Sequence, residues 1–199
     1  MNIVKFLVKG GQKTAFLCYT HCRENFALFE EEKMNKTEFV IRQAVADDVT
    51  KVAYIEERCF PKSEAATLKS FFERFMAFAD CFLVAEADGK VIGYINGCVT
   101  SYDKLIDALY HNAALHEPDG PWQTVFGIAV LPEYQHQGVA SALMENFKAN
   151  AKLRGKKGIL LTCKDEKIGF YEKLGFTCKG VSSSSHGGAR WNDMIFNFS

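Results

Sequence analysis

The sequence lacks the features that mark several specialised classes of protein. Only 4 of its 199 residues are proline, against 15 glycines, which excludes a collagen-like or proline-rich disordered chain. Its 24 basic and 24 acidic side chains sum to a formal charge of zero, so no global basic field favours nucleic acid or anionic lipid. No uncharged apolar run reaches the ~18 residues that suggest a membrane span. We therefore expect neither a nucleic-acid partner nor a membrane partner.

The cysteines form no pattern that indicates disulfides or a metal site. They number 7, an odd count, and several stand inside apolar runs, where cysteine behaves as a small hydrophobic residue. Cys18, His21 and Cys22 lie close together, yet no second pair of ligands follows at a spacing suited to zinc. No small-residue cleavage site follows the short apolar stretch at the N-terminus. These observations predict a reduced, cytoplasmic protein without a metal.

What remains is a composition typical of a globular domain, 48% hydrophobic and 24% charged. Residues 1–33 differ from the rest because they lack a clean hydrophobic period and end in a run of charges. We expect them to be an N-terminal extension, flexible or helical, ahead of one domain over residues 34–199. The alternative is that Phe26, Leu28 and Phe29 anchor a helix on this domain or on a second subunit.

From Phe39 onward the hydrophobic pattern alternates between the periods of strands and helices. We expect strands over residues 39–44, 81–85, 91–98, 124–130, 158–163, 176–178 and 191–198, and helices over 48–60, 68–76, 138–151 and 166–174. Asp88-Gly89 between two apolar runs favours a hairpin. The serines at 182–185, followed by the His-Gly-Gly of 186–188, are typical of a mobile turn. This order of elements predicts an α/β domain with a mixed sheet.

The junction between the strand at 124–130 and the next helix is the most informative segment. A polar loop that ends at Gly138 leaves amide groups exposed at a helix N-terminus, where the helix dipole favours an anion such as a pyrophosphate. An ordinary strand–turn–helix link, with Gly138 needed for tight packing, explains the residues equally well. Neither the phosphate-loop motif nor GxGxxG occurs, which argues against nucleoside triphosphates and dinucleotides.

Two motifs resemble those of a known family. Residues 135–140, Gln-His-Gln-Gly-Val-Ala, are similar to the Q/R-x-x-G-x-G/A signature of the GNAT superfamily of acetyl-CoA-dependent N-acetyltransferases. Residues 168–176 are similar to its second signature, FYxxxGF, which follows in the expected order and at the expected separation. The resemblance covers residues 39–198. It implies a mixed, mostly antiparallel central sheet that is flanked by helices and splayed between its two central strands.

Within the superfamily, the chain is most similar to the arylalkylamine N-acetyltransferase-like (serotonin N-acetyltransferase-like) group. Residues 59–61, 115–120 and 163–165 carry this finer resemblance. The vertebrate enzymes of that group have two histidines on the strand before the pyrophosphate loop, where this sequence has Thr124 and Phe126. The proton relay of those enzymes is therefore not implied for this chain.

The resemblance implies roles for individual residues. Tyr171 matches the tyrosine that protonates the departing thiolate, and the Ile128 amide matches the donor that polarises the thioester carbonyl. The residues expected to bind acetyl-CoA are Ile128, Ala129, Val130, His136, Gln137, Gly138, Val139, Ala140, Ser141 and Phe170. An acyl-enzyme on Cys163 is disfavoured, because the family reacts by direct attack. Without the resemblance, a buried core tyrosine would be the simpler explanation of Tyr171.

The sequence does not name the base that deprotonates the acceptor. An alkyl amine is mostly protonated at neutral pH, so a base or a chain of waters must remove a proton. His116 lies in the loop before the strand at 124–130 and is the first candidate, with Glu57 and Glu64 behind it. A solvated surface position explains a lone loop histidine at least as well.

The expected function is transfer of the acetyl group from acetyl-CoA to a primary amine, by direct attack within a ternary complex. The expected acceptor is a small amine, aromatic or a polyamine, and some of the rings of Phe71, Phe72, Phe75, Phe78 and Phe82 would line its pocket. The alternatives are a protein acetyltransferase that acts on a lysine or an N-terminus, and a non-catalytic acyl-CoA-binding module. An exposed sheet edge would allow a homodimer.

Overall fold

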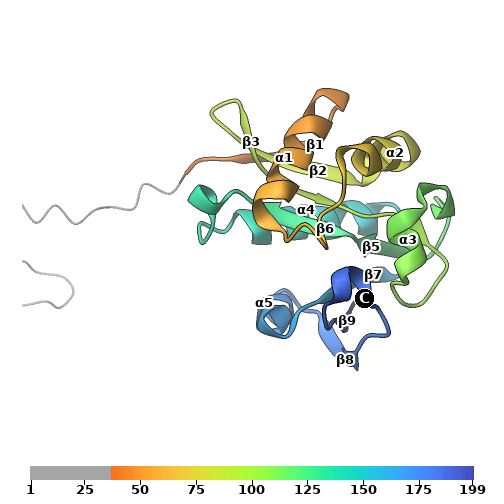
Figure 1. Cartoon of the computed structure of the whole chain (residues 1–199). Helices are drawn as coiled ribbons and strands as arrows, with labels where there is room; N and C mark the ends of the chain where they lie inside the picture. The colour runs from red at the N-terminus through yellow and green to blue at the C-terminus, as the bar shows by residue number, and fades with distance from the viewer. Residues whose placement is uncertain (1–36) are drawn as a thin grey trace, which may run out of the picture. The chain divides into compact units, whose positions relative to one another are not determined.

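Two sheets form the centre of the protein, of which the computed structural model describes residues 37–199. The first contains, in spatial order, β1 (Val40–Gln43), β2 (Phe82–Ala87), β3 (Lys90–Asn96) and β6 (Gly127–Val130). The second contains, in spatial order, β4 (Val99–Thr100), β5 (Trp122–Val125), β7 (Gly158–Cys163), β9 (Asn192–Asn197) and β8 (Thr177–Val181). β5 and β7 run parallel, and the other described pairs are antiparallel. This mixed, mostly antiparallel arrangement confirms the expected fold class (Figure 1).

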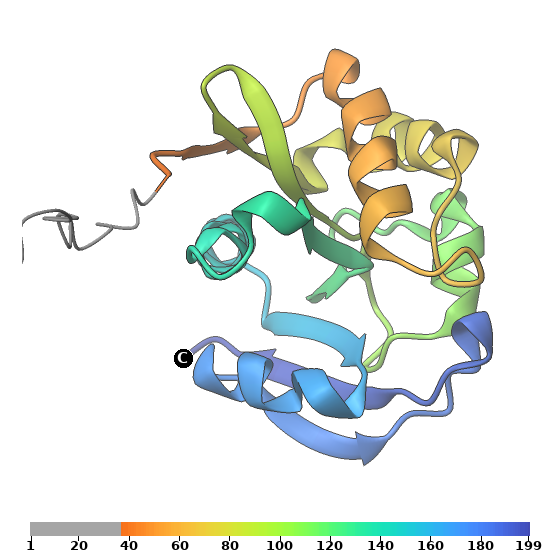
Figure 2. The same ribbon diagram turned by 60° about the vertical axis from the view of Figure 1, so that its left-hand side comes forward.

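Helices cover both faces of the first sheet (Figure 2). The longer helices are α1 (Val49–Cys59), α2 (Leu68–Phe78) and α4 (Val139–Leu153), and the shorter ones are α3 (Asp107–His111) and α5 (Ile168–Lys173). Tyr94 of β3 faces α1, because its hydroxyl reaches Glu56. The neighbouring Gly93 faces α4, because a β-carbon built there would lie 3.3 Å from Leu143. Since successive strand residues point to opposite faces, α1 and α4 lie on opposite sides of the sheet.

The strand expected over 124–130 is divided in two at Phe126. The Phe126 amide donates to the Asn96 carbonyl at 2.7 Å, although Asn96 stands opposite Gly127 in the register. Phe126 and Gly127 therefore both stand opposite the single residue Asn96. This is the arrangement of a β-bulge, which bends the strand. Before the bulge β5 pairs with β7, and after it β6 pairs with β3. The two sheets therefore splay apart here, as the family resemblance implied (Figure 2).

Apolar side chains on both faces of the first sheet form the core. Leu143 and Phe147 of α4 pack on one face, while Val52 of α1 and Phe71 of α2 pack on the other. All four are fully buried. Burial of each such side chain stabilises the fold by ~1.5–3 kcal/mol relative to exposure. The packing on both faces therefore fixes the position of β6, whose free edge forms part of the candidate site.

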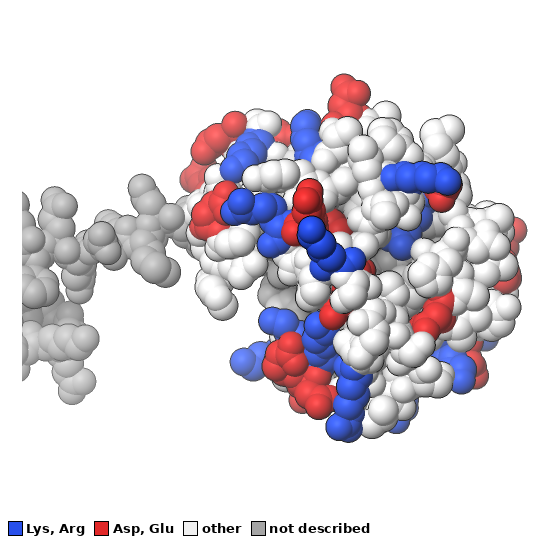
Figure 3. Space-filling view, viewed as in Figure 1, with Lys and Arg blue, Asp and Glu red and all other residues white. Residues whose placement is uncertain are grey.

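Several sequence expectations have a different outcome or fall outside the described part. The loop-rich stretch after β3 contains β4 and α3, which the patterns did not predict. The expected extension at 1–33, with Cys18, His21 and Cys22, lies outside the described residues. Within residues 37–199, no helix has both the length and the apolarity needed to cross a bilayer. On the face shown in Figure 3, acidic and basic side chains are interspersed.

Candidate active site

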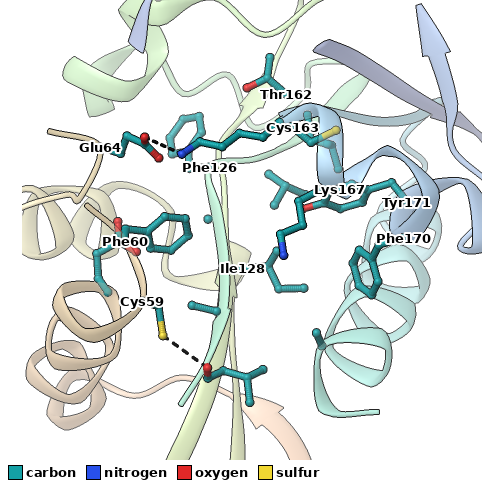
Figure 4. A pocket seen from close by; sticks show the side chains of 18 of the residues that line it. Cys59, Phe60, Glu64, Phe126, Ile128, Thr162, Cys163, Lys167, Phe170 and Tyr171 are labelled. Carbon is teal, nitrogen blue, oxygen red and sulfur yellow. Dashed lines mark hydrogen bonds and ion pairs between the residues drawn. The ribbon is translucent and has the colours of Figure 1, made fainter. Parts of the chain in front are cut away.

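A cleft of about 690 Å³ lies where the two sheets splay apart. Its walls come from β6 and β7, the N-terminus of α4, α5, and the loops that follow α1 and β8 (Figure 4). It brings together most residues predicted from the sequence, namely Ile128, Ala129, Val130, His136, Gly138, Val139, Ala140, Ser141, Phe170 and Tyr171. Gln137 and His116 are not among its lining residues.

One edge of β6 turns backbone groups toward the cleft. β6 is the last strand of its sheet, and beyond it the Leu131 amide donates to the Ile92 carbonyl of β3 at 2.9 Å. In an antiparallel pair alternate residues bond to the partner, so Leu131 turns toward β3 while Ile128 and Val130 turn the other way. The Val130 carbonyl already accepts a hydrogen bond from Gln135 Nε2 at 2.8 Å. The Ile128 amide and carbonyl and the Val130 amide thus face the cleft.

The loop that precedes α4 provides a second set of amides. His136 and Gly138 have φ angles of 61° and 87°, and such a curled backbone turns its amides into a concavity that suits an anion. The Ala142 amide donates to the Gly138 carbonyl at 3.0 Å and begins the helical hydrogen bonds. The amides of residues 139–141 therefore have no partner within the helix. Together with the helix dipole, they form a cradle suited to a pyrophosphate.

Two predicted residues lie away from the cleft. The Gln137 side chain accepts from the Thr37 amide at 3.1 Å and donates to the Glu133 carbonyl at 3.2 Å, so it braces the loop. His116 Nδ1 accepts from the Val99 amide at 3.0 Å. Burial lowers the pKa of His116, which favours its neutral form. The structure therefore does not bring His116 together with Tyr171 and β6 in the lining of the cleft.

Tyr171 of α5 points its hydroxyl into the cleft toward β6 (Figure 4). The residue is 8% exposed, and its hydroxyl makes no hydrogen bond with any residue of the described part of the chain. Burial raises the pKa of Tyr171, so the phenol keeps its proton at neutral pH and can donate it. Gly175 (φ 84°) ends the helix, and the Phe176 amide donates to the Tyr171 carbonyl at 3.1 Å. This C-terminal turn fixes the backbone that carries the hydroxyl.

A buried carboxylate on α1, which the sequence patterns did not reveal as functional, also lines the cleft. Glu56 accepts hydrogen bonds from the Tyr94 hydroxyl and from the Ala66 amide, the latter at 2.9 Å. Burial raises the pKa of Glu56, and the hydrogen bond from Tyr94 opposes that effect. A carboxylate with a raised pKa in a cleft is suited to accept a proton from a substrate. The sequence held a signal, since Glu56 falls among the apolar positions of the helix expected over 48–60.

Contacts between the walls close the end of the cleft that contains Glu64, which we call the far end. Lys164 Nζ lies 2.7 Å from Glu64 Oε1, the contact drawn as a dashed line at Glu64 in Figure 4. His186 Nε2 lies 3.0 Å from the Glu64 carbonyl oxygen. The His186 ring stacks on Tyr110, with ring centroids 4.7 Å apart. Glu64 thus lines the cleft, whereas Glu57, the other carboxylate considered as a base, is exposed and does not.

Aromatic side chains line this end, though not the ones expected. The aromatic residues that line the cleft near Glu64 are Phe60, Tyr110, Phe126, His186 and Trp191. None of the five phenylalanines of the expected cluster is among the lining residues, and Phe71, Phe78 and Phe82 lie in the core. An aromatic acceptor pocket would therefore be formed by these five lining residues and not by the phenylalanine cluster.

Cys163 lines the cleft as a thiol unsuited to nucleophilic attack. Burial raises its pKa to about 12, so the reactive thiolate is scarce at neutral pH. In the described part of the chain, no group of three or more His, Cys, Asp or Glu side chains could hold a metal ion. Among the lining groups, Glu56 can accept a proton, Tyr171 can donate one, and the backbone amides can hold an anion.

Comparisons with known proteins agree with this geometry. The family model of the acetyltransferase (GNAT) domain matches residues 79–178. An N-alpha-acetyltransferase of Sulfurisphaera tokodaii is 29% identical over 155 residues, which cover 74% of this chain and 85% of that protein. Among solved structures, the GphF GNAT-like decarboxylase in complex with isobutyryl-CoA has a TM-score of 0.70 at 20% identity, covering 79% of this chain and 98% of that one. Ard1 from Thermoplasma volcanium has a TM-score of 0.64 at 20% identity, covering 81% and 98%. The chain belongs to the GNAT acetyltransferase family and is an acetyl-CoA-dependent N-acetyltransferase.

Proposed function

We propose that the acceptor is a small primary amine with an aromatic group, acetylated by direct attack within a ternary complex. The observation that supports this most strongly is the closed, aromatic end of the cleft. The Glu64–Lys164 ion pair and the His186 contact join its walls, and Phe60 and Trp191 line it. A short amine with an apolar ring fits such an enclosure, whereas a polypeptide needs an open groove.

The cosubstrate would lie along the two sets of free amides. Its pyrophosphate would occupy the cradle at residues 136–141, which matches the anion preference of that helix N-terminus. Its pantetheine arm would pair with the open edge of β6 in place of a further strand. The thioester carbonyl would then lie at the Ile128 amide, between β6 and Tyr171. A single hydrogen bond to a developing oxyanion can lower a barrier by roughly 3 kcal/mol.

Three proton transfers complete the reaction. The acceptor arrives as an ammonium ion, and Glu56 takes one proton from it, directly or through a water, and later releases that proton to solvent. The neutral nitrogen attacks the thioester carbon, so that a C–N bond forms, and the C–S bond then breaks. Tyr171 donates its proton to the departing thiolate and is reprotonated by the nitrogen, which loses its second proton to leave the neutral amide. Glu56 takes the place that sequence reasoning gave first to His116.

A protein acceptor is the second candidate. It is favoured by the similarity to a relative named N-alpha-acetyltransferase. For a peptide N-terminus to enter from the far end, the contact between Glu64 and Lys164 would have to open. A purely acyl-CoA-binding role is disfavoured, because Glu56 and Tyr171 supply the base and the acid that only turnover needs.

A competition assay distinguishes these acceptors. The protein is incubated with acetyl-CoA and an equimolar mixture of arylalkylamines, polyamines, lysine peptides and peptides with free N-termini, and acetylated products are identified by mass spectrometry. The proposal predicts that arylalkylamines are consumed first. Preferential acetylation of peptides would establish the second candidate instead, and saturable acetyl-CoA binding without any product would favour a binding role.

A further inference from the structure

The serine-rich segment between β8 and β9 is tied to a carboxylate outside the cleft. Asp107, the first residue of α3, accepts hydrogen bonds from the Ser184 hydroxyl at 2.5 Å and from the Ser185 amide at 3.0 Å. The Ser185 hydroxyl adds a longer contact at 3.4 Å. The Ser184 hydroxyl in turn accepts from the His186 amide at 3.3 Å. The sequence suggested that this segment is a mobile turn, but two of its successive residues, Ser184 and Ser185, are hydrogen-bonded to α3.

The same segment forms one wall of the closed end of the cleft. Trp191 Nε1 donates to the His186 carbonyl at 2.9 Å, which joins two of the lining rings. Gly187 has a φ of 61°, and a β-carbon on it would collide with the Glu64 side chain and approach the Ser63 carbonyl oxygen to 3.0 Å. The wall is thus in direct contact with the loop that follows α1.

Asp107 and the rings belong to one connected unit. Tyr110 lies one helical turn after Asp107 on α3, and its ring stacks on His186. The Tyr110 hydroxyl is 3.1 Å from the Thr162 hydroxyl of β7. α3 therefore contacts the cleft through Tyr110, and through Asp107 it holds the two serines that precede His186 in the chain. Asp107 itself is not among the residues that line the cleft.

We propose that Asp107 is a positioning residue for acceptor binding: by holding Ser184 and Ser185 it places His186 and Trp191 as the wall against which the acceptor's ring packs. The inference rests on the proposed small-amine acceptor. Its distinctive consequence is that a residue touching neither substrate sets the affinity for one of them. The cradle at residues 136–141 belongs to α4 and its preceding loop, so acetyl-CoA binding is independent of Asp107.

The test compares the full chain with its Asp107→Ala variant, using the arylalkylamine that the unmodified protein acetylates best. KM for that amine should rise by about tenfold or more, because the acceptor must then order a loosened wall as it binds. kcat and KM for acetyl-CoA should stay within about twofold. Asp107→Asn keeps one acceptor oxygen, so its KM for the amine should fall between those of the unmodified protein and of Asp107→Ala. Asp103→Ala, at an exposed aspartate four residues earlier, is the matched control and should leave all constants unchanged.

Amide hydrogen exchange provides a readout that does not depend on turnover. The amides of Ser185 and His186 should exchange faster in Asp107→Ala, while those of α4 stay protected. Unchanged exchange would contradict the anchoring role. Faster exchange with an unchanged KM for the amine would show that the wall does not contact the acceptor, and a parallel fall in kcat and melting temperature would show a general structural role. If the unmodified chain acetylates no small amine, the proposed acceptor fails, and the exchange result alone decides whether Asp107 holds the segment.

A second variant approaches the same wall from the other side. Gly187→Ala should push the segment away from Glu64, because the new methyl group has no room and the backbone there is left-handed. KM for the amine should again rise while KM for acetyl-CoA stays constant. Gly180→Ala, at a positive-φ glycine of β8 with open space around it, controls for backbone strain alone. Equal effects of the two glycine variants on amine binding would contradict the proposal.

Discussion

The hydroxyl of Tyr94 donates a hydrogen bond to Glu56 in the wall of the cleft. The same hydroxyl would lie 2.8 Å from a β-carbon on Gly127, the residue just before Ile128. One phenol thus connects the buried carboxylate of α1 to the start of β6. Glu56 is thereby held beside the strand whose amide is expected to receive the thioester carbonyl.

Removing that phenol tests how Glu56 is controlled. In Tyr94→Phe the carboxylate keeps the Ala66 amide but loses a donor that stabilises its charged form, so its pKa should rise further. Because the base works only when ionised, the acid limb of kcat/KM should move to higher pH. Arg74 of α2 and His186 also act on Glu56 and remain in place. The measurement is a pH profile with the preferred amine.

Tyr54→Phe, an exposed position of α1, is the matched control for that experiment. Its profile should coincide with that of the unmodified protein. A lower plateau in Tyr94→Phe without any displacement of the acid limb would mean that Tyr94 only supports the packing.

Glu56→Gln should remove the acid limb altogether. The amide has nearly the shape of the carboxylate but cannot take a proton, and loss of a general base lowers kcat by ~10²–10⁴. Activity of the unmodified protein should rise with pH through the elevated pKa of Glu56, whereas the residual activity of the variant should follow only the amount of free amine. Undiminished kcat in Glu56→Gln, measured at saturating acetyl-CoA, would assign the proton transfer to water.

Gly138→Ala should weaken acetyl-CoA binding. Gly138 has a φ of 87°, where a β-carbon costs about 1–2 kcal/mol, and relief of that strain would distort the cradle of amides. We expect the Kd for acetyl-CoA, measured by calorimetry, to rise by about fivefold or more. Gly155→Ala is matched, with a φ of 70° and open space beyond the end of α4. Both variants should lose similar stability, and an equal loss of acetyl-CoA affinity in both would contradict the cradle.

Asp48 lies at the start of α1, the helix that carries Glu56. Burial alone would raise the pKa of Asp48, but hydrogen bonds from Arg42, the Val45 amide and Lys51 outweigh it and hold that pKa at about 2. The pKa is lower in the folded state, so this stabilisation is present above pH ~3.8 and is lost as the pH falls toward ~2. Asp48→Asn should lower the free energy of unfolding by about 2 kcal/mol at neutral pH, a figure reduced because Arg42 is partly exposed.

Urea unfolding at neutral and acidic pH measures this difference. The gap between Asp48→Asn and the unmodified protein should narrow as the pH approaches ~2, where Asp48 becomes protonated in both states. Asp47→Asn, at the exposed neighbouring position, should show no such gap. A gap that does not change with pH would assign the loss to packing.

The helices and strands could be predicted from the sequence because their apolar positions recur at clear periods. The helix that begins near Gly138 and the stop at Gly175 are at the predicted places, since each depends on local backbone preferences. The break at Phe126 could not be predicted in this way. Both halves of that strand have the same apolar character, and the break arises because β5 pairs with β7 while β6 pairs with β3.

In the candidate site, too, the features set by neighbouring residues could be predicted from the sequence, and those set by contacts across the fold could not. The cradle and Tyr171 follow from contiguous motifs, whereas the positions of Glu56 and Asp107 depend on contacts across the fold. Glu56 meets Tyr94 38 residues later, and Asp107 meets Ser184 77 residues later. The place of His116 in the sequence, near β5, suggested a base, whereas in the fold its Nδ1 accepts from the Val99 amide and it does not line the cleft.

The most direct test of the account is the rate of product formation by Tyr171→Phe at saturating acetyl-CoA and arylalkylamine, with acetyl-CoA affinity measured on the same preparation. Tyr102→Phe, at an exposed tyrosine, serves as the control. Tyr171→Phe should bind acetyl-CoA normally and form product at least about tenfold more slowly, because only the acid is lost. Product formation at the unmodified rate, with acetyl-CoA still bound, would contradict the assignment of Tyr171 as the group that protonates the departing thiolate.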